Sequence, residues 1–139
     1  MTVFDTDVLT LLLAGVPGYV SLFGGLVSPE VRLPIVGIEE VLRGRLDAIR
    51  KAQQADRGEA LPMAYSNFGL DFDRLKPFVI LPYTPAAHTI YLMWRTSKIR
   101  IGTQDLRIAA ICVAHDATLV SRNKRDFDKV SELKLSVWN

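Results

Sequence analysis

Acidic side chains stand next to several apolar segments of this sequence. Asp5 directly follows the apolar pair at residues 3–4, and Asp105 opens a longer apolar stretch. Glu40 and Asp126 come shortly after two further apolar segments. Two carboxylates about 4 Å apart repel each other by roughly 4 kcal/mol at an effective dielectric constant near 20, so a cleft that gathers several of them favours a bound cation. Oxygen-only ligands suit Mg²⁺ or Mn²⁺, which can activate water and neutralise charge on a phosphate.

Each acidic residue also has an ordinary structural interpretation. Asp5 can cap the helix predicted after it, and Asp105 is favoured by the dipole of its own helix. Glu40 can be a solvated helical residue, and Asp126 can form a surface ion pair with its basic neighbours. Only the joint pattern indicates a metal site, and spacing alone leaves that interpretation open.

The elements that would position these residues alternate between strand and helix. Strands are predicted at residues 3–4, 33–36, 78–81, 118–121 and 135–138. Helices are predicted at residues 7–14, from Pro17 to about residue 26, from Ile38 onward, at 59–75, from residue 85, and at 104–114 with Thr103 as the N-cap. This alternation predicts a single α/β domain over residues 1–139. We expect three layers, α/β/α, whose middle layer is a parallel sheet of four to five strands. Sites in such sheets form at the carboxyl ends of the strands.

Composition narrows the class of protein. Hydrophobic residues make up 49% and charged residues 23% of the chain, which predicts a compact fold and excludes a disordered tail. The single cysteine, Cys112, excludes an internal disulfide and lies in an apolar segment where we expect it to be buried. The net charge of +2 is compatible with a polyanionic partner. We expect no membrane span and no signal peptide, and therefore a cytoplasmic protein.

Four segments resemble the motifs of PIN-domain ribonucleases, in particular the VapC-like toxins of type II toxin–antitoxin pairs. In order, they are residues 3–9 (VFDTDVL), 40–44 (EVLRG), 102–110 (GTQDLRIAA) and 119–127 (LVSRNKRDF). The third segment is the most specific, and together the four span nearly the whole chain in the family's order. The resemblance implies a PIN-like fold and a divalent-metal-dependent endoribonuclease whose products carry a 3′-hydroxyl and a 5′-phosphate.

The resemblance also implies roles for individual residues. Asp5, Glu40, Asp105 and Asp126 match the family's catalytic, metal-ligating acids, with Asp5 and Asp105 as the principal ligands. The residues expected to line the pocket or bind substrate are Ser121, Arg122, Asn123 and Lys124.

Three departures from the family pattern leave details open. Asp7 stands where the family usually has asparagine. Glu39 precedes Glu40, although the spacing to the following glycine favours Glu40. Asp128 is a second candidate for the fourth acid, whose position varies in the family.

The implied partners are RNA, a cognate antitoxin that blocks the active site, and a second copy of the chain in a homodimer. Basic residues near the acids suit an RNA backbone, and single-stranded RNA is favoured because a small cleft can reach its exposed groups. A charged helix surface is the alternative interpretation of these basic residues. They are Arg95, Lys98, Arg100, Arg122, Lys124, Arg125 and Lys129.

Two other functions fit parts of the sequence. Asp5 and Asp7 satisfy the Asp-x-Asp nucleophile motif of haloacid-dehalogenase-like phosphatases, but the chain is short for that fold and residues 102–110 stay unexplained. A non-catalytic PIN-like module that binds RNA or protein is the other alternative, and the presence of all four acids argues against it.

Overall fold

A computed structural model of the chain describes residues 1–18, 30–55 and 58–138. Its central element is a five-stranded sheet with the strand order β3-β2-β1-β4-β5, in which all neighbours run parallel. The strands are β1 (Thr2–Phe4), β2 (Val31–Pro34), β3 (Val79–Leu81), β4 (Thr118–Ser121) and β5 (Lys134–Val137). The helices are α1 (Thr6–Leu13), α3 (Ile35–Ala55), α4 (Ala60–Leu75), α5 (Pro85–Thr96), α6 (Thr103–Ala114) and α7 (Lys124–Phe127). The predicted parallel α/β architecture is confirmed, and the sheet has five strands where four to five were predicted.

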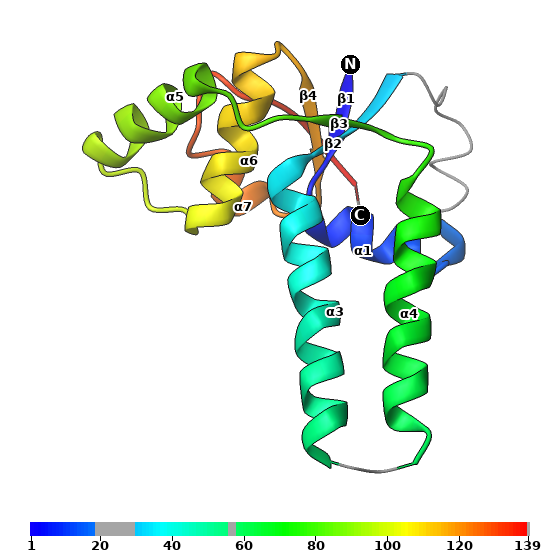
Figure 1. Cartoon of the computed structure of the whole chain (residues 1–139). Coiled ribbons are helices and arrows are strands. Elements are labelled where there is room, and N and C mark those ends of the chain that lie inside the picture. Colours follow the sequence, from blue (N-terminus) through cyan, green and yellow to red (C-terminus); the bar gives the residue numbers. More distant parts are fainter. Residues whose placement is uncertain (19–29, 56–57, 139) are drawn as a thin grey trace.

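Helices cover both faces of the sheet (Figure 1). Successive residues of a strand point to opposite faces, and the buried residues divide accordingly into two clusters. Val3 and Leu119 pack with residues of α5 and α6 in one cluster. Phe4 and Val120 pack with residues of α1, α3 and α4 in the other. Because α6 is buried among these layers, its residues from Ile108 to Cys112 have no exposed surface, which confirms the predicted burial of Cys112.

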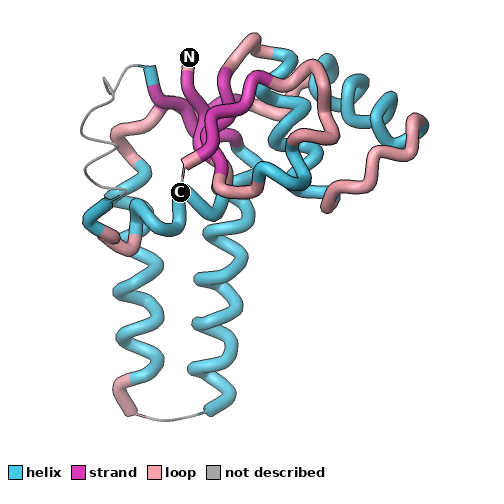
Figure 2. Tube along the Cα trace, turned by 180° about the vertical axis from the view of Figure 1, so that it is seen from behind, coloured by secondary structure: helices cyan, strands magenta, loops and turns pink. Residues whose placement is uncertain are grey.

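The helices α3 and α4 form a long pair that extends away from the sheet (Figures 1 and 2). An ion pair with a buried carboxylate joins the two helices. Arg45 Nε donates to Asp71 Oδ2 at 2.6 Å, and the Asp71 side chain is only 1% exposed. Arg74 of α4 also donates to the Leu13 carbonyl at 2.7 Å and thereby ties α4 to the end of α1.

Two predicted boundaries are wrong for identifiable reasons. The strand predicted at residues 33–36 occupies Val31–Pro34, and α3 begins at Ile35 rather than Ile38. Pro34 has no N–H to continue the ladder, whereas the apolar residues after it suit a buried helix as well as a strand. The predicted N-cap, Thr103, is the first residue of α6, and Gly102 is the N-cap. The Thr103 hydroxyl instead accepts a hydrogen bond from Arg95 at 2.9 Å.

The remaining boundaries lie within a residue or two of their predictions. The helix predicted from Pro17 to about residue 26 falls mostly outside the described residues. No helix in the described part of the chain combines the length and apolar character that crossing a membrane requires.

Candidate active site

Asp5 lies directly after β1, at the carboxyl edge of the sheet, and is 4% exposed. One carboxylate oxygen caps α1 by accepting from the Val8 backbone N–H at 2.9 Å. The other accepts a short hydrogen bond from Ser121, which ends the neighbouring strand β4. The capping interpretation of Asp5 is therefore confirmed, and the cap itself holds the carboxyl group at the sheet edge. Burial raises the pKa of Asp5 above its ordinary value, although the hydrogen bonds from Ser121 and Val8 oppose this shift.

The two adjacent glutamates of α3 have different surroundings. Glu40 is half-buried and accepts a hydrogen bond from the Thr6 hydroxyl at 2.6 Å, which ties α3 to the start of α1. Glu39 is exposed and binds Arg43 at 2.5 Å and Gln104 at 2.6 Å. Glu40 is thus the glutamate whose side chain meets the element that follows Asp5.

Asp105 lies in the first turn of α6 and is half-buried. Burial, and then the negative charges of Glu40, Asp5, Asp7 and Asp126, raise the pKa of Asp105 to about 6. No described residue donates a hydrogen bond that offsets this shift. Asp105 is therefore a carboxyl group whose main electrostatic neighbours, within the part of the chain that the structure describes, are other acids.

Asp126 lies in the short helix α7 at the edge of this neighbourhood. Asn123 holds its carboxylate through the amide Nδ2 at 3.0 Å, and Lys129 lies 3.4 Å away. These contacts lower the pKa of Asp126, the hydrogen bond from Asn123 being the main cause. The interpretation of Asp126 as half of an ion pair is thus confirmed, with its predicted neighbour Arg125 at 3.6 Å and with Lys129, whereas Lys124 pairs with Asp128. Asp128, the alternative fourth acid, is exposed and paired with Lys124.

The donor set of this site suits a hard divalent cation, but its arrangement does not close around one. All the candidate ligands are carboxylates, which Mg²⁺ and Mn²⁺ prefer. Among residues 1–18, 30–55 and 58–138, however, no three acidic, histidine or cysteine side chains are arranged to ligate one ion directly. Mg²⁺ usually keeps several water ligands and needs only one or two carboxylates. The chemistry of these residues therefore suits such a cation when one or two carboxylates hold it and water fills its remaining positions.

The four residues predicted to bind substrate lie along β4 and the turn after it. Ser121 is fully buried, and its hydroxyl accepts from the Asn123 backbone N–H at 2.9 Å while donating to Asp5. Arg122 is exposed, and Lys124 points to Asp128. Ser121 and Asn123 thus support the acids, and Arg122 presents charge at the surface beside them.

Replacing Ser121 with alanine should lower the free energy of unfolding by about 1–3 kcal/mol, because a buried acceptor and donor lose their shared partner. It should also raise the pKa of Asp5 further, since the hydroxyl stabilises the carboxylate form. Urea denaturation measures the first effect. Ser97→Ala, at an exposed site, is the control, and equal stability of the two variants would contradict the prediction.

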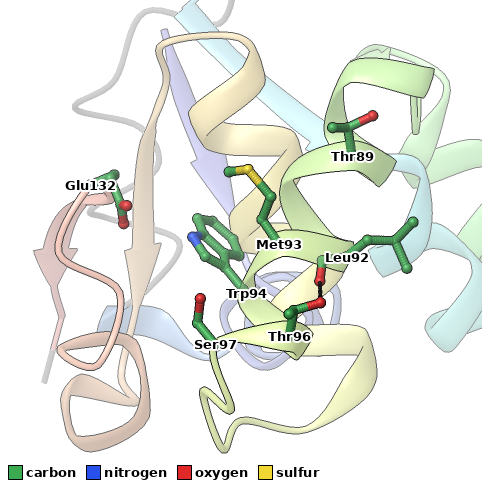
Figure 3. Close-up of a pocket in the computed structure, with 7 residues that line it drawn as sticks. All are labelled: Thr89, Leu92, Met93, Trp94, Thr96, Ser97 and Glu132. Atoms are coloured by element: carbon green, nitrogen blue, oxygen red, sulfur yellow. Dashed lines mark hydrogen bonds between the residues drawn. The ribbon is translucent and has the colours of Figure 1, made fainter.

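Another hollow among the described residues lies away from these acids. It has a volume of about 530 Å³ and is formed mainly by α5, with Leu92, Met93, Trp94 and Glu132 among its lining residues (Figure 3). None of the predicted site residues borders it. Since its lining holds a single acidic side chain, this hollow does not provide the chemistry that the sequence predicts.

Sequence reasoning missed two groups of polar residues near the site. Thr6 was read only as part of a motif, although its hydroxyl fixes Glu40. The buried pair of Arg45 and Asp71 was not predicted at all. A signal for Asp71 does exist, because it lies on the same helical face as the buried residues Ala64 and Leu75.

Comparison with solved structures gives full-length similarity of fold. A VapBC2 structure from Rickettsia felis, bound to a DNA fragment from its promoter, matches with a TM-score of 0.77 and 20% identity over 99% of this chain and 98% of that chain. FitAcB from Neisseria gonorrhoeae matches with a TM-score of 0.76 and 23% identity over 100% and 97%. DNA-bound VapBC from Salmonella typhimurium matches with a TM-score of 0.79 and 15% identity over 99% and 98%. The chain has the PIN-like fold of VapC toxins.

This VapC-like fold agrees with the resemblance drawn from the four motifs. No family model matches the sequence, and no curated protein matches it. The similarity therefore rests on structure and on the order of the motifs along the chain.

Proposed function

We propose that the chain is an endoribonuclease that depends on Mg²⁺ or Mn²⁺ and acts as the toxin of a toxin–antitoxin pair. The observation that carries this proposal is the state of Asp105, a half-buried carboxyl group raised to a pKa of about 6 by burial and by four other acids. Such a group is costly to keep in a fold unless a cation binds beside it. Perturbed carboxyl groups in a cleft are a frequent mark of functional sites.

The residues have distinct parts in the proposed reaction. Asp5 and Asp105 would hold the cation, which would supply an activated water and neutralise charge on the phosphodiester. Glu40 and Asp126 orient water around the site. Ser121 keeps the Asp5 carboxyl group at the sheet edge, and Thr6 does the same for Glu40.

The substrate in this proposal is single-stranded RNA. Exposed basic residues adjoin the acids, among them Lys124, and Lys129 contacts Asp126 directly. Charges of this kind attract the phosphate backbone without reading its sequence. An unpaired strand can present one phosphodiester to a small cleft.

The partners in this proposal are a cognate antitoxin and a second copy of the chain. This part of the proposal is supported by similar folds in toxin–antitoxin complexes, including one from Klebsiella pneumoniae. A cytoplasmic location follows from the proposed RNA substrate.

A cleavage assay tests the proposed activity. The purified chain should cut single-stranded RNA with Mg²⁺ or Mn²⁺ and stop cutting when EDTA removes the metal. Asp5→Asn should lose the activity, whereas Asp73→Asn, on the exposed surface of α4, should keep it. Cleavage that continues in EDTA, or in the Asp5 variant, would contradict the proposal. Absence of cleavage together with RNA binding that needs no metal would favour a non-catalytic binding module.

A further inference from the structure

A polar hollow lies beside the candidate active site and has no part in the mechanism above. Its volume is about 460 Å³, and its lining includes Asp7, Arg122, Asn123 and Trp138. This volume is within the range of about 300–1,000 Å³ that small-molecule sites occupy. The lining combines a carboxylate, a guanidinium group, an amide and an indole ring.

Hydrogen bonds connect the hollow to the acids. The Asn123 backbone N–H donates to the Ser121 hydroxyl at 2.9 Å, and this hydroxyl donates to Asp5. The charge of Asp7 also contributes to the raised pKa values of Asp5 and Asp105. The hollow is therefore next to the residues that surround the acids.

The structure fixes the aromatic wall of the hollow. The Trp138 ring packs on Phe4 with 5.4 Å between ring centroids, and the Trp138 backbone N–H donates to the Ser121 carbonyl at 2.9 Å. Trp138 is half-buried and is one of the residues that line the hollow. Aromatic side chains beside a basic groove are the usual platform on which single-stranded nucleic acids stack their bases.

The polar groups have a defined pattern of donors and acceptors. The exposed Asp7 carboxylate offers only acceptors, and Arg122 offers only donors. The Asn123 amide is held by Asp126, which leaves it one N–H and one acceptor lone pair. The two acceptor oxygens of Asp7 and the donor groups of Arg122 therefore line the same hollow.

We infer that this hollow binds the base of one nucleotide of the RNA substrate, and that Asp7 makes guanine the preferred base. The inference rests on the proposed function, because it assigns the hollow to the substrate of that site. Guanine has two adjacent N–H groups on its pairing edge, which match both oxygens of a carboxylate. Its O6 and N7 atoms match a guanidinium group, and this contact is a common form of guanine recognition.

The other bases fit the lining less well. Adenine places a lone pair where guanine has its N1–H, so a carboxylate at that point repels it. Uracil presents a single N–H between two acceptors on this edge, and cytosine presents one amino group followed by two acceptors, so neither offers two adjacent N–H groups. Because one good bidentate contact discriminates between bases by about 5-fold or more, the preference for guanine should be measurable with nucleosides alone.

Quenching of tryptophan fluorescence by nucleosides tests the inference on the whole chain in EDTA, where no cleavage occurs. Guanosine should quench the wild-type protein at concentrations about 5–10-fold lower than adenosine. Inosine, which lacks the 2-amino group, should fall between them. Asp7→Asn should bring guanosine to the level of adenosine, whereas Asp73→Asn should behave as wild type. Trp138→Phe should lose the quenching, although Trp94 is still present.

Three results would overturn the inference. They are equal quenching by guanosine and adenosine, a guanosine preference that survives in Asp7→Asn, and no quenching by any nucleoside. Because the assay contains neither metal nor phosphodiester, failure of the proposed nuclease activity leaves its outcome unchanged. Conversely, a nuclease that cuts substrates with guanine and adenine next to the cleavage site equally well would refute the base preference and leave the activity standing.

Discussion

Replacing Arg45 with methionine should lower the free energy of unfolding by about 3–5 kcal/mol, because it strands the carboxylate of Asp71 in the protein interior. Asp71 is 1% exposed, and Arg45 is its ion-pair partner across α3 and α4. The Arg45 side chain is 35% exposed, so water can solvate its charge when Asp71 is removed. Asp71→Asn should therefore cost less than Arg45→Met, and urea denaturation measures both.

The double variant Arg45→Met, Asp71→Leu isolates the cause of this loss. It removes both charges and leaves apolar side chains, so it should recover much of the stability that Arg45→Met loses. Arg50→Met is the matched control, because Arg50 pairs with Asp47 on the exposed surface of the same helix. Such exposed pairs contribute between zero and about 1 kcal/mol. A loss in Arg45→Met no larger than in Arg50→Met would show that the buried pair adds nothing to the α3–α4 packing.

The consequence of Arg45→Met should extend to the site. Arg45 follows Glu40 on α3, and both residues line a hollow of about 300 Å³ between α1, α3 and α4. Because a typical domain is stable by only about 5–15 kcal/mol, loss of the pair removes a large fraction of what holds α3 in place. The position of Glu40, which the sequence motif identifies, thus depends on the pair of Arg45 and Asp71, which belongs to no motif.

The sequence predicted the sheet well because its strands and helices differ in the period of their apolar residues. The strand at Thr118–Ser121 was predicted with its exact bounds, and α6 within one residue, since a helix that is apolar on nearly every side and follows a glycine has few alternatives. The start of α3 was missed because β-branched residues after Pro34 are compatible with either element. Only pairing with β1 and β3 decides where β2 stops, and pairing is not visible in a single segment.

The surroundings of the candidate residues were partly predictable. Placement of Asp5 and Glu40 near the strand ends follows from topology, and the Glu-x-x-x-Gly spacing favoured Glu40 over Glu39. The structure supplies the contact that separates them, from Thr6 to Glu40. The pairing of Asp128 with Lys124 and of Asp126 with Asn123 depends on the turn geometry of α7, which residue types alone do not define. The roles of these residues in metal binding and catalysis stay predictions.

Asp105→Asn should make the metal-free protein more stable at pH 7.5 while it abolishes the response to metal. In the wild type, the folded-state pKa of about 6 lies above the unfolded value of 3.8. The folded state thus binds more protons between these values, and the contribution of Asp105 to stability falls as pH rises from about 4 through 6. Asparagine carries no charge and avoids this loss. After allowance for partial exposure of Asp105, the gain should be about 1–2 kcal/mol.

The same substitution should remove the benefit of a bound cation. Mn²⁺ should raise the melting temperature of the wild type, since a ligand that binds only the folded state stabilises it by mass action. This shift should shrink as pH falls through about 6, because a proton on Asp105 competes with the metal. In Asp105→Asn the shift should be absent, and RNA cleavage should fall by at least about 100-fold, since loss of outer-shell partners alone can cost 10–100-fold.

Opposite effects on stability and activity distinguish this explanation from simple damage to the fold. Asp116→Asn is the matched control, because Asp116 is an exposed aspartate paired with Lys134 at the amino ends of β4 and β5, not at their carboxyl ends. It should change neither the Mn²⁺ shift nor cleavage. A variant at residue 105 that is less stable than wild type in EDTA at pH 7.5 would show that its carboxylate is not strained by its neighbours. A variant that keeps the full Mn²⁺ shift would show that the cation binds elsewhere, and the electrostatic argument for the site would fail with it.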